Sequence, residues 1–457
     1  MKGPQRLILI LLMQAIPHLI SGQASDSILR LSISQARDYA LLYNRTVQSS
    51  KIDIDLAEKK IRENLATGLP QVSVAANYLH QFVVPEISFG SFLDIDALPA
   101  GPVTGDDIRN AFADLPSIPL GVKNNTTIDL TLSQLIFSGQ YFIALRASKV
   151  VRELSEKNLA RTEDLTKEAV AVSYYLILIL QENIRLLNEN KLALDQMSEE
   201  TAAMNKQGLN EETDVDQVNI NRSNIQTIIT SMESQMEIAL KNFRYLLGVS
   251  FEQPLELTDG LDEIIKEGNL MYLSSPEFDV RNSIDFQLID MQEKISEQLF
   301  KLEKSRYLPV ISAFYRHQEQ TNQPEFNFAV KDIIGASLNL PIFSSGIRSS
   351  KVSQARFEME KTRLNKQNTE MGLTMEFETA RNDYRTAYSN FTVNRESLEL
   401  SRKIYDRTVI KFREGISSSF ELTQIQNQFL TAESTYYNSL LSLLKSKAKL
   451  DRILKIN

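Results

Sequence analysis

The side chains that most often carry enzyme chemistry are scarce in this sequence. Among its 457 residues there is no cysteine, and histidine occurs only at His18, His80 and His317. Disulfides, thiolate metal sites and cysteine nucleophiles are therefore excluded, and the usual general base and commonest metal ligand are almost absent. No nucleophile stands in a recognisable arrangement with a base. We expect a protein that is not an enzyme and that uses no cofactor and no metal.

The charge balance also narrows the range of partners. Lysine and arginine total 50 against 58 aspartate and glutamate residues, which gives a net charge of −8. Phosphate backbones are bound through clustered positive charge, so this acidic balance disfavours a nucleic-acid partner.

The N-terminus has the features of an export signal. Lys2 and Arg6 precede an apolar run from Leu7 to Ile16, and small or polar residues follow. This pattern predicts a signal peptide over residues 1–23. The run is shorter than the roughly 20 residues that a membrane-spanning helix needs, and no later run is longer, so we expect no such helix. An uncleaved N-terminal anchor is the alternative.

Proline and glycine are absent from very long stretches. Residues 140–207 contain neither, and no proline follows Pro341. A helix from Tyr141 to Asn205 would be on the order of 98 Å long, far beyond the helices of compact domains. A further helix is expected at about 34–66.

Two short regions alternate strictly between apolar and polar residues. Residues 127–133 and 334–340 both have this pattern, which predicts strands with one apolar face. Each has an upstream partner that opens with Leu-Pro, at 69–74 and 308–313. Each half of the chain therefore supplies one pair of strands.

The two halves are repeats of one another. Residues 132–139 (LSQLIFSG) superpose on 338–345 (LNLPIFSS) at an offset of 206, and Gly208 superposes on Gly415 at 207. Apolar residues then follow at spacings of 3, 4 and 7, as in a coiled-coil seam. We predict a first repeat over 24–250, an irregular linker over 251–280 and a second repeat over 281–457.

The glycines predict the turns of two helical hairpins. Gly208 and Gly415 suit left-handed residues that end helices. Residues 213–216 (TDVD) and 418–421 (SSFE) resemble capping boxes that would start the returning helices.

Four strands of about 9 to 13 residues cannot close a barrel alone, so they need copies of themselves. A membrane barrel uses strands of this length, with apolar side chains toward lipid and polar ones toward water, and three protomers would supply twelve strands. The lipid-facing set is Val72, Val74, Ile128, Leu130, Leu132, Ile334, Ala336, Leu338 and Leu340. The lumen-facing set is Gln71, Ser73, Asp129, Thr131, Ser133, Ser337 and Asn339.

Several of these stretches resemble the TolC family of outer-membrane efflux proteins. The resemblance rests on their duplicated order, and it covers nearly all of the chain after the signal peptide. The stretches are LPQVSV (69–74), IFSG (136–139), LPIFSSG (340–346), KQGL (206–209) and REGI (413–416). It implies a mainly α fold with long antiparallel helical hairpins, four β-strands per protomer and an internal duplication. It also implies a homotrimer with a twelve-stranded barrel in outer-membrane lipid, a periplasmic adaptor, and an inner-membrane pump of the RND or ABC type.

The resemblance places the gate and the adaptor contacts at the hairpin tips. The adaptor-binding positions carried over from the family are Gly208, Leu209, Gly415 and Ile416, and the gate positions are Thr213, Asp214, Phe412, Arg413, Glu421 and Gln424. In a trimer, three copies of Glu421 would face one another, which raises their pKa values and attracts cations. Alternatively, Glu421 is only the acid of a capping box that begins at Ser418.

The chain departs from the family pattern at the gate. Gln424 stands where a second acid is expected, and Phe412 and Ser417 replace the tyrosine and arginine that close the family's gate. We therefore hypothesise that Arg413 pairs with Asp214 of a neighbouring hairpin. A simple solvated arginine is the alternative, because exposed pairs contribute little.

The sequence thus predicts a passive outer-membrane export duct that opens at its helical tips. An exported coiled-coil scaffold or adhesin, without transport activity, is the alternative. We expect the loop at 79–125 to lie at the outer surface, and His80 and His317 to occupy equivalent strand ends without a metal.

Overall fold

The computed structural model describes residues 28–87, 101–102, 106–108, 117–267, 278–323, 327 and 329–455. The predicted signal peptide at 1–23 lies outside these residues. Two compact units are present, and each combines segments from both halves of the chain. The strand unit comprises Arg45–Leu165, Ser274–Thr386 and Lys449–Asn457, and the hairpin unit comprises Met1–Asn44, Thr166–Leu273 and Ala387–Ala448. The predicted division into repeats at 24–250 and 281–457 stays a prediction.

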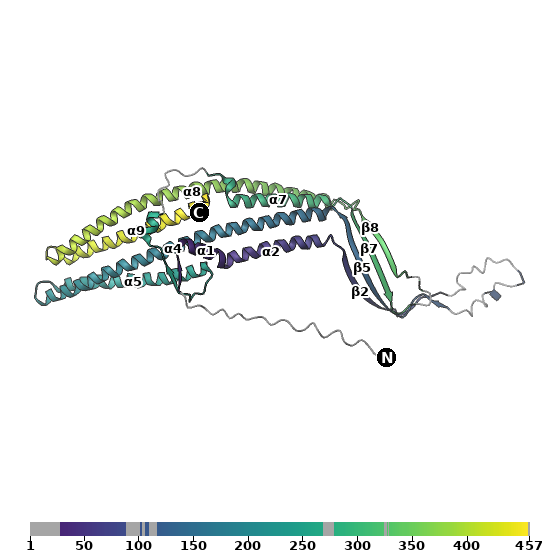
Figure 1. The fold of residues 1–457 in the computed structure, drawn as a ribbon, viewed down its shortest axis with the longest axis horizontal. Helices are drawn as coiled ribbons and strands as arrows, with labels where there is room; N and C mark the ends of the chain where they lie inside the picture. Colours follow the sequence, from purple (N-terminus) through teal and green to yellow (C-terminus); the bar gives the residue numbers. More distant parts are fainter. Residues whose placement is uncertain are drawn as a thin grey trace, which may run out of the picture. The chain divides into compact units, whose positions relative to one another are not determined.

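Four antiparallel strands form the sheet of the strand unit, in the order β2-β5-β7-β8 (Figure 1). They confirm the predicted strand pairs, and β5 is longer than its strictly alternating part. Their bounds are Gln71–His80 for β2, Asn124–Ser138 for β5, Val310–Gln320 for β7 and Asp332–Asn339 for β8. Consecutive strands thus neighbour one another within each repeat, and β5 joins β7 across the repeats.

The strand register puts the predicted polar set on one face. Gln71 lies opposite Ser133 and Ser73 opposite Thr131, while Ser337 and Asn339 lie opposite residues of β7. The other face is apolar and open: Val72 is 68% exposed and Ile334 is 84% exposed. Large apolar side chains are seldom left in such a continuous exposed patch on a soluble protein.

The two repeats carry matching polar clusters at the far ends of their strands, on the apolar face. In the first, Asn124 Oδ1 accepts the Tyr78 hydroxyl at 3.0 Å and lies 2.7 Å from Nδ1 of His80. In the second, Asp332 Oδ1 accepts the Tyr315 hydroxyl at 2.6 Å and lies 2.7 Å from Nδ1 of His317. The two histidines occupy equivalent strand positions, as the repeat predicts.

Part of the predicted outer loop is described. Strands β3 (Glu86–Ile87) and β4 (Ile118–Pro119) form a two-residue antiparallel ladder within it. Residues 88–100, 103–105 and 109–116 of this loop lie outside the described part.

Helices with charged surfaces complete the strand unit. They are α2 (Arg45–Ala66), α7 (Ile284–Ser305), the 3₁₀ turn η3 (Val280–Asn282) and the first halves of α4 and α8. Lys366 of α8 donates to Asp290 at 2.5 Å and to Glu293 at 2.8 Å. These hydrogen bonds lower the pKa values of both carboxyl groups and raise that of Lys366. The contact between α7 and α8 is therefore stabilised by partly buried ion pairs.

The hairpin unit has its core around a small parallel ladder. Strand β1 (Leu29–Leu31) pairs with β6 (Leu255–Leu257), and α1 (Ile33–Tyr43) and α6 (Leu261–Glu267) adjoin them. Tyr174 and Phe243 pack edge to face at 5.9 Å in this core. The Tyr174 hydroxyl donates to the Leu31 carbonyl at 3.1 Å, and burial raises its pKa. Part of the predicted irregular linker at 251–280 is thus ordered.

The predicted helix at 34–66 is interrupted. Helix α1 ends at Tyr43, and Asn44 is extended, with its Nδ2 donating to the Leu246 carbonyl at 2.7 Å. Gly248 packs here with φ +76°, and a Cβ on it would lie 2.1 Å from the Tyr43 carbonyl oxygen. This close contact explains both the break and the glycine.

Two very long helices and their partners form the hairpins, as the absence of proline and glycine predicts (Figure 1). The first hairpin is α4 (Gly139–Lys206) with α5 (Glu212–Leu247), and the second is α8 (Ile347–Arg413) with α9 (Ser419–Leu454). We expected no helix that is long and apolar enough to span a membrane. This expectation is wrong, because α4 has a sufficient length and a sufficiently apolar segment. More than half of its apolar window is buried, at 56%, which fits a core helix.

Candidate gate at the hairpin tips

Both hairpins turn through the same backbone motif. At the first tip, Gly208 N–H donates to Asn205 and Leu209 N–H to Met204, at 2.9 and 3.0 Å. At the second, Gly415 N–H donates to Phe412 and Ile416 N–H to Lys411, at 3.0 and 2.8 Å. Gly208 and Gly415 have φ values of +76° and +72°. These are Schellman motifs, which confirms the predicted left-handed glycines.

The first returning helix starts two residues earlier than predicted. Glu211 is its N-cap and forms the capping box with Asp214, whose carboxylate accepts the Glu211 N–H at 3.3 Å. Thr213 is already in the first turn and donates its hydroxyl to Glu211 Oε2 at 3.1 Å. The predicted cap at Thr213 is therefore wrong, because a glutamate takes the place of the expected hydroxyl.

The second returning helix starts where predicted, but its acid has another partner. The Ser418 hydroxyl accepts the Glu421 N–H at 3.2 Å, which confirms Ser418 as the N-cap. The Glu421 carboxylate instead accepts the hydroxyl of buried Ser417 at 2.8 Å. Glu421 and Gln424 are both exposed. Ser417, at the family's arginine position, thus orients the acid that we assigned to the pore.

Arg413 pairs within its own protomer. Its Nε lies 3.1 Å from Oε2 of Glu200 on α4, and both side chains are nearly half exposed. Asp214 is engaged in its own capping box. The hypothesised pairing of Arg413 with Asp214 of a neighbouring hairpin stays a prediction, and Glu200 is a partner that sequence reasoning missed.

The two hairpins share one apolar seam next to the tips. Tyr405 of α8 and Phe429 of α9 stack at 5.2 Å, and burial raises the pKa of Tyr405 to about 12. Phe412, the residue at the family's tyrosine position, packs at the edge of this cluster. The buried members from all four helices are Leu187, Leu194, Met197, Val218, Ile225, Ile229, Tyr405, Leu422 and Phe429.

A hydrogen bond from a buried asparagine joins the two returning helices. Asn221 of α5 is 5% exposed and donates through Nδ2 to the Thr423 hydroxyl of α9 at 2.8 Å. The sequence did not single out Asn221 or its partner. The two hairpins are thus joined by apolar packing, by Asn221–Thr423 and by Arg413–Glu200.

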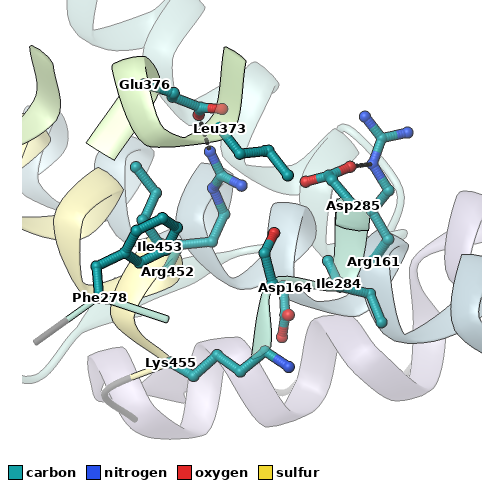
Figure 2. Close-up of a pocket in the computed structure, with 11 residues that line it drawn as sticks. Arg161, Asp164, Phe278, Ile284, Asp285, Leu373, Glu376, Arg452, Ile453 and Lys455 are labelled. Atoms are coloured by element: carbon teal, nitrogen blue, oxygen red, sulfur yellow. Dashed lines mark hydrogen bonds and ion pairs between the residues drawn. The ribbon is translucent and has the colours of Figure 1, made fainter. Parts of the chain in front are cut away.

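A small pocket lies in the strand unit (Figure 2). Its charged lining is largely paired: Arg161 with Asp285 at 2.6 Å, and Arg452 with Glu376 at 3.1 Å. Phe278 stacks on Phe377 at 4.6 Å beside it. These contacts join α4 to α7 and the end of α9 to α8, so the pocket lies where the helices of the strand unit are held together. The described residues hold no cluster of three or more metal-binding side chains.

The comparison with protein families gives a match to the second half of the chain. Residues 282–454, which include β7, β8 and the second hairpin, match the family described as outer membrane efflux protein. The second half of the chain is therefore similar to outer membrane efflux proteins. This match supports an efflux channel of the outer membrane that extends into the periplasm, rather than an enzyme. A comparison with curated proteins gives no match.

Solved structures of outer-membrane channels share the fold over nearly the whole chain. The CusC transmembrane channel matches with a TM-score of 0.72 and 13% identity, covering 93% of this chain and 92% of CusC. The CmeC outer membrane channel of Campylobacter jejuni matches with a TM-score of 0.68 and 16% identity, covering 92% and 85%. The open MtrE channel of Neisseria gonorrhoeae matches with a TM-score of 0.66 and 12% identity, covering 92% and 88%. The first repeat, which the family match does not reach, therefore has the efflux-channel fold as well.

Proposed function

We propose that this efflux protein works as a homotrimeric passive duct that opens at its periplasmic hairpin tips. The observation that carries the proposal is the open four-stranded sheet, whose edge strands β2 and β8 have no further strand beside them among the described residues. An open edge in hydrocarbon leaves backbone groups unsatisfied, so the sheet must close with other copies. Three copies supply the twelve strands of a barrel.

The helices support the same assembly. The strand β2 follows α2, and β8 precedes α8, so a copy that pairs its β2 with β8 also brings its α2 beside α8. Helix α8 has an exposed apolar stripe at spacings of 7, 7 and 4, formed by Phe357, Leu364, Met371 and Met375. Ile52 and Leu56 are exposed on α2. Such stripes are typical of coiled-coil seams that lack a partner.

The tips suit a gate and a docking surface. Three copies of Glu421 around the axis would make one acidic ring, with Gln424 one turn further on, and such a ring favours cations. Leu209 and Ile416 are 69% and 75% exposed beside the two tip glycines. We assign these apolar residues to a periplasmic adaptor, and the energy for transport to an inner-membrane pump of the RND or ABC type.

Two neighbouring residues of β5 test the duct. Leu130 lies on the apolar face and Thr131 on the polar face of the same strand. Leu130→Arg is expected to cost about 2–4 kcal/mol if that face meets the bilayer midplane, and to abolish the heat-modifiable trimer in carbonate-washed outer membranes. Thr131→Arg should assemble normally and reduce the cation preference of the channel in planar bilayers.

The opposite outcome would favour the scaffold or adhesin reading. If both faces are wet, Leu130→Arg is tolerated as well as Thr131→Arg, and the protein washes off the membrane at alkaline pH. A monomer in mild detergent with no conductance would overturn the duct.

A further inference from the structure

Helix α9 buries an acid, Glu433, with an enclosed carboxylate oxygen that accepts no hydrogen bond from the described residues. Glu433 is 2% exposed within the single protomer, so its burial does not depend on assembly. Its Oε2 atom is enclosed and makes no hydrogen bond to any described residue. Gln426, two turns earlier on the same helix, is also 2% exposed, and neither polar atom of its amide has a partner. Unsatisfied buried polar groups are rare in folded proteins and call for an explanation.

The charges around Glu433 come from the helices packed on α9. Arg402 of α8 attracts the carboxylate, and Glu182 of α4 repels it. Glu182 is itself held by Arg185, with Nη2 2.6 Å from Oε1. Tyr437, one turn further along α9, faces the same group of charges, and burial raises its pKa. The charges on α4 and α8 therefore act on Glu433 in opposite directions.

Burial dominates the protonation of this acid. Loss of solvent raises the pKa of Glu433 to about 7 from 4.5, against the weaker opposing attraction of Arg402. An ionised carboxylate enclosed without a partner is costly, and the cost is avoided either by binding a proton or by moving into water.

We propose that Glu433 is a proton-controlled lock on the second hairpin. When the acid is neutral, it stays sealed between α9 and its neighbours, and the hairpins remain packed. When it is charged, it draws α9 away from α4 and α8 until water reaches the carboxylate. The inference rests on the proposed function in one respect, namely that separation of the hairpins is the movement that opens the duct.

The direction of the pH effect follows from linkage. The acid has a higher pKa in the packed state than in water, so packing is strongest at low pH and weakens as the pH rises from 4.5 to about 7. For these two pKa values, the ratio of separated to packed hairpins rises about 30-fold between about pH 5.5 and pH 8.5.

The duplication provides a matched control. Gln226 of α5 is equivalent to Glu433 at the 207-residue offset, and it is exposed. An acid there should titrate as it does in water. Gln226→Glu therefore adds the same charge to the first hairpin without the buried site.

The experiment measures the distance between the tips. The chain has no native cysteine, so spin labels can be attached to cysteines at the exposed positions 209 and 416. Labelled full-length protomers, diluted with unlabelled ones in detergent-solubilised trimers, would be examined by pulsed electron resonance from about pH 5.5 to pH 8.5. In parallel, infrared titration would follow the carbonyl band of a protonated carboxyl group.

We expect the separated population to rise with pH and the infrared band to disappear near pH 7. Glu433→Gln and the apolar Glu433→Leu should abolish both changes, and Gln226→Glu should alter neither. A pH response that survives in Glu433→Gln and Glu433→Leu, or a wild-type distance that does not change with pH, would overturn the inference. If separation follows Glu433 while the conductance does not change, the lock stands and the proposed gate is wrong.

Discussion

The two hairpins have the same turn but different buried faces. Both tips end in a Schellman motif around a left-handed glycine. In α5 the buried residues keep the predicted seam, with Val218, Ile225 and Ile229 all enclosed. In α9 the equivalents of these three are only half-buried, and buried positions shift to residues 422, 426, 429, 433, 437 and 440.

This difference shows that the two repeats share the hairpin turn but not the set of residues that the returning helix buries. Helix α9 packs on α8 and also on the first hairpin, so its buried face is wider and includes polar residues. Helix α5 keeps a narrow apolar seam with one hydrogen-bonded asparagine. We infer that the second hairpin carries the switchable contacts, and the first serves as the fixed surface against which it moves.

The largest expected effect comes from equivalent positions 429 and 222. Phe429 is buried and stacked on Tyr405, whereas Arg222 is exposed and pairs with Asp195 at 3.0 Å. Phe429→Ala should lower the free energy of hairpin opening by about 3–5 kcal/mol, because it leaves a cavity. Arg222→Ala should cost less than about 1 kcal/mol. Amide hydrogen exchange of α5 and α9 would measure the effect of each substitution. Similar losses of protection in the two variants would contradict the difference between the two hairpins.

A smaller effect is expected at the hydrogen bond between the returning helices. Asn221→Ala removes the donor to Thr423 and should weaken hairpin packing by about 1–2 kcal/mol. Thr423→Ser keeps the hydroxyl and serves as the control, while Thr423→Val should approach the loss in Asn221→Ala. The same exchange measurement applies, and unchanged protection in Asn221→Ala would show that the bond is incidental.

The smallest effect is expected at the exposed tip pair. Arg413→Ala should change the open probability of reconstituted channels only a few-fold, since an exposed ion pair contributes about 0.2–1 kcal/mol and is screened by salt. Glu200→Gln should reproduce it if the pair within the protomer is the relevant one. If Asp214→Asn reproduces it instead, Arg413 reaches a neighbouring hairpin in the trimer, as the sequence first suggested.

Local patterns were enough to predict the elements of this fold. Strict alternation in residues 127–133 and 334–340 predicted β5 and β8, and their faces agree with the observed register. The stretch without proline or glycine predicted α4 to within two residues at each end. Gly208 and Gly415 revealed both turns, because few other residues tolerate a positive φ.

Features that depend on distant contacts were not predictable. The helix break at Asn44 requires the Leu246 carbonyl, about 200 residues away in sequence. The Arg413–Glu200 pair joins α8 to α4. The periodicity of each helix alone does not show how the two helices are rotated relative to one another. The burial of Glu433 has the same origin, since its helical position is equivalent to that of an exposed glutamine in the first repeat.

The tight joint at Gly248 has a mechanical consequence. It ends α5 against the Tyr43 carbonyl, where any larger residue would collide. The 36 residues of α5 form an arm of about 54 Å that starts from this fulcrum. A tilt of about 5° at the fulcrum would displace the far end by about 5 Å, roughly the width of a small solute, along an arm of that length. Sub-ångström movements at Gly248 would therefore change the width of the opening at the far end of α5.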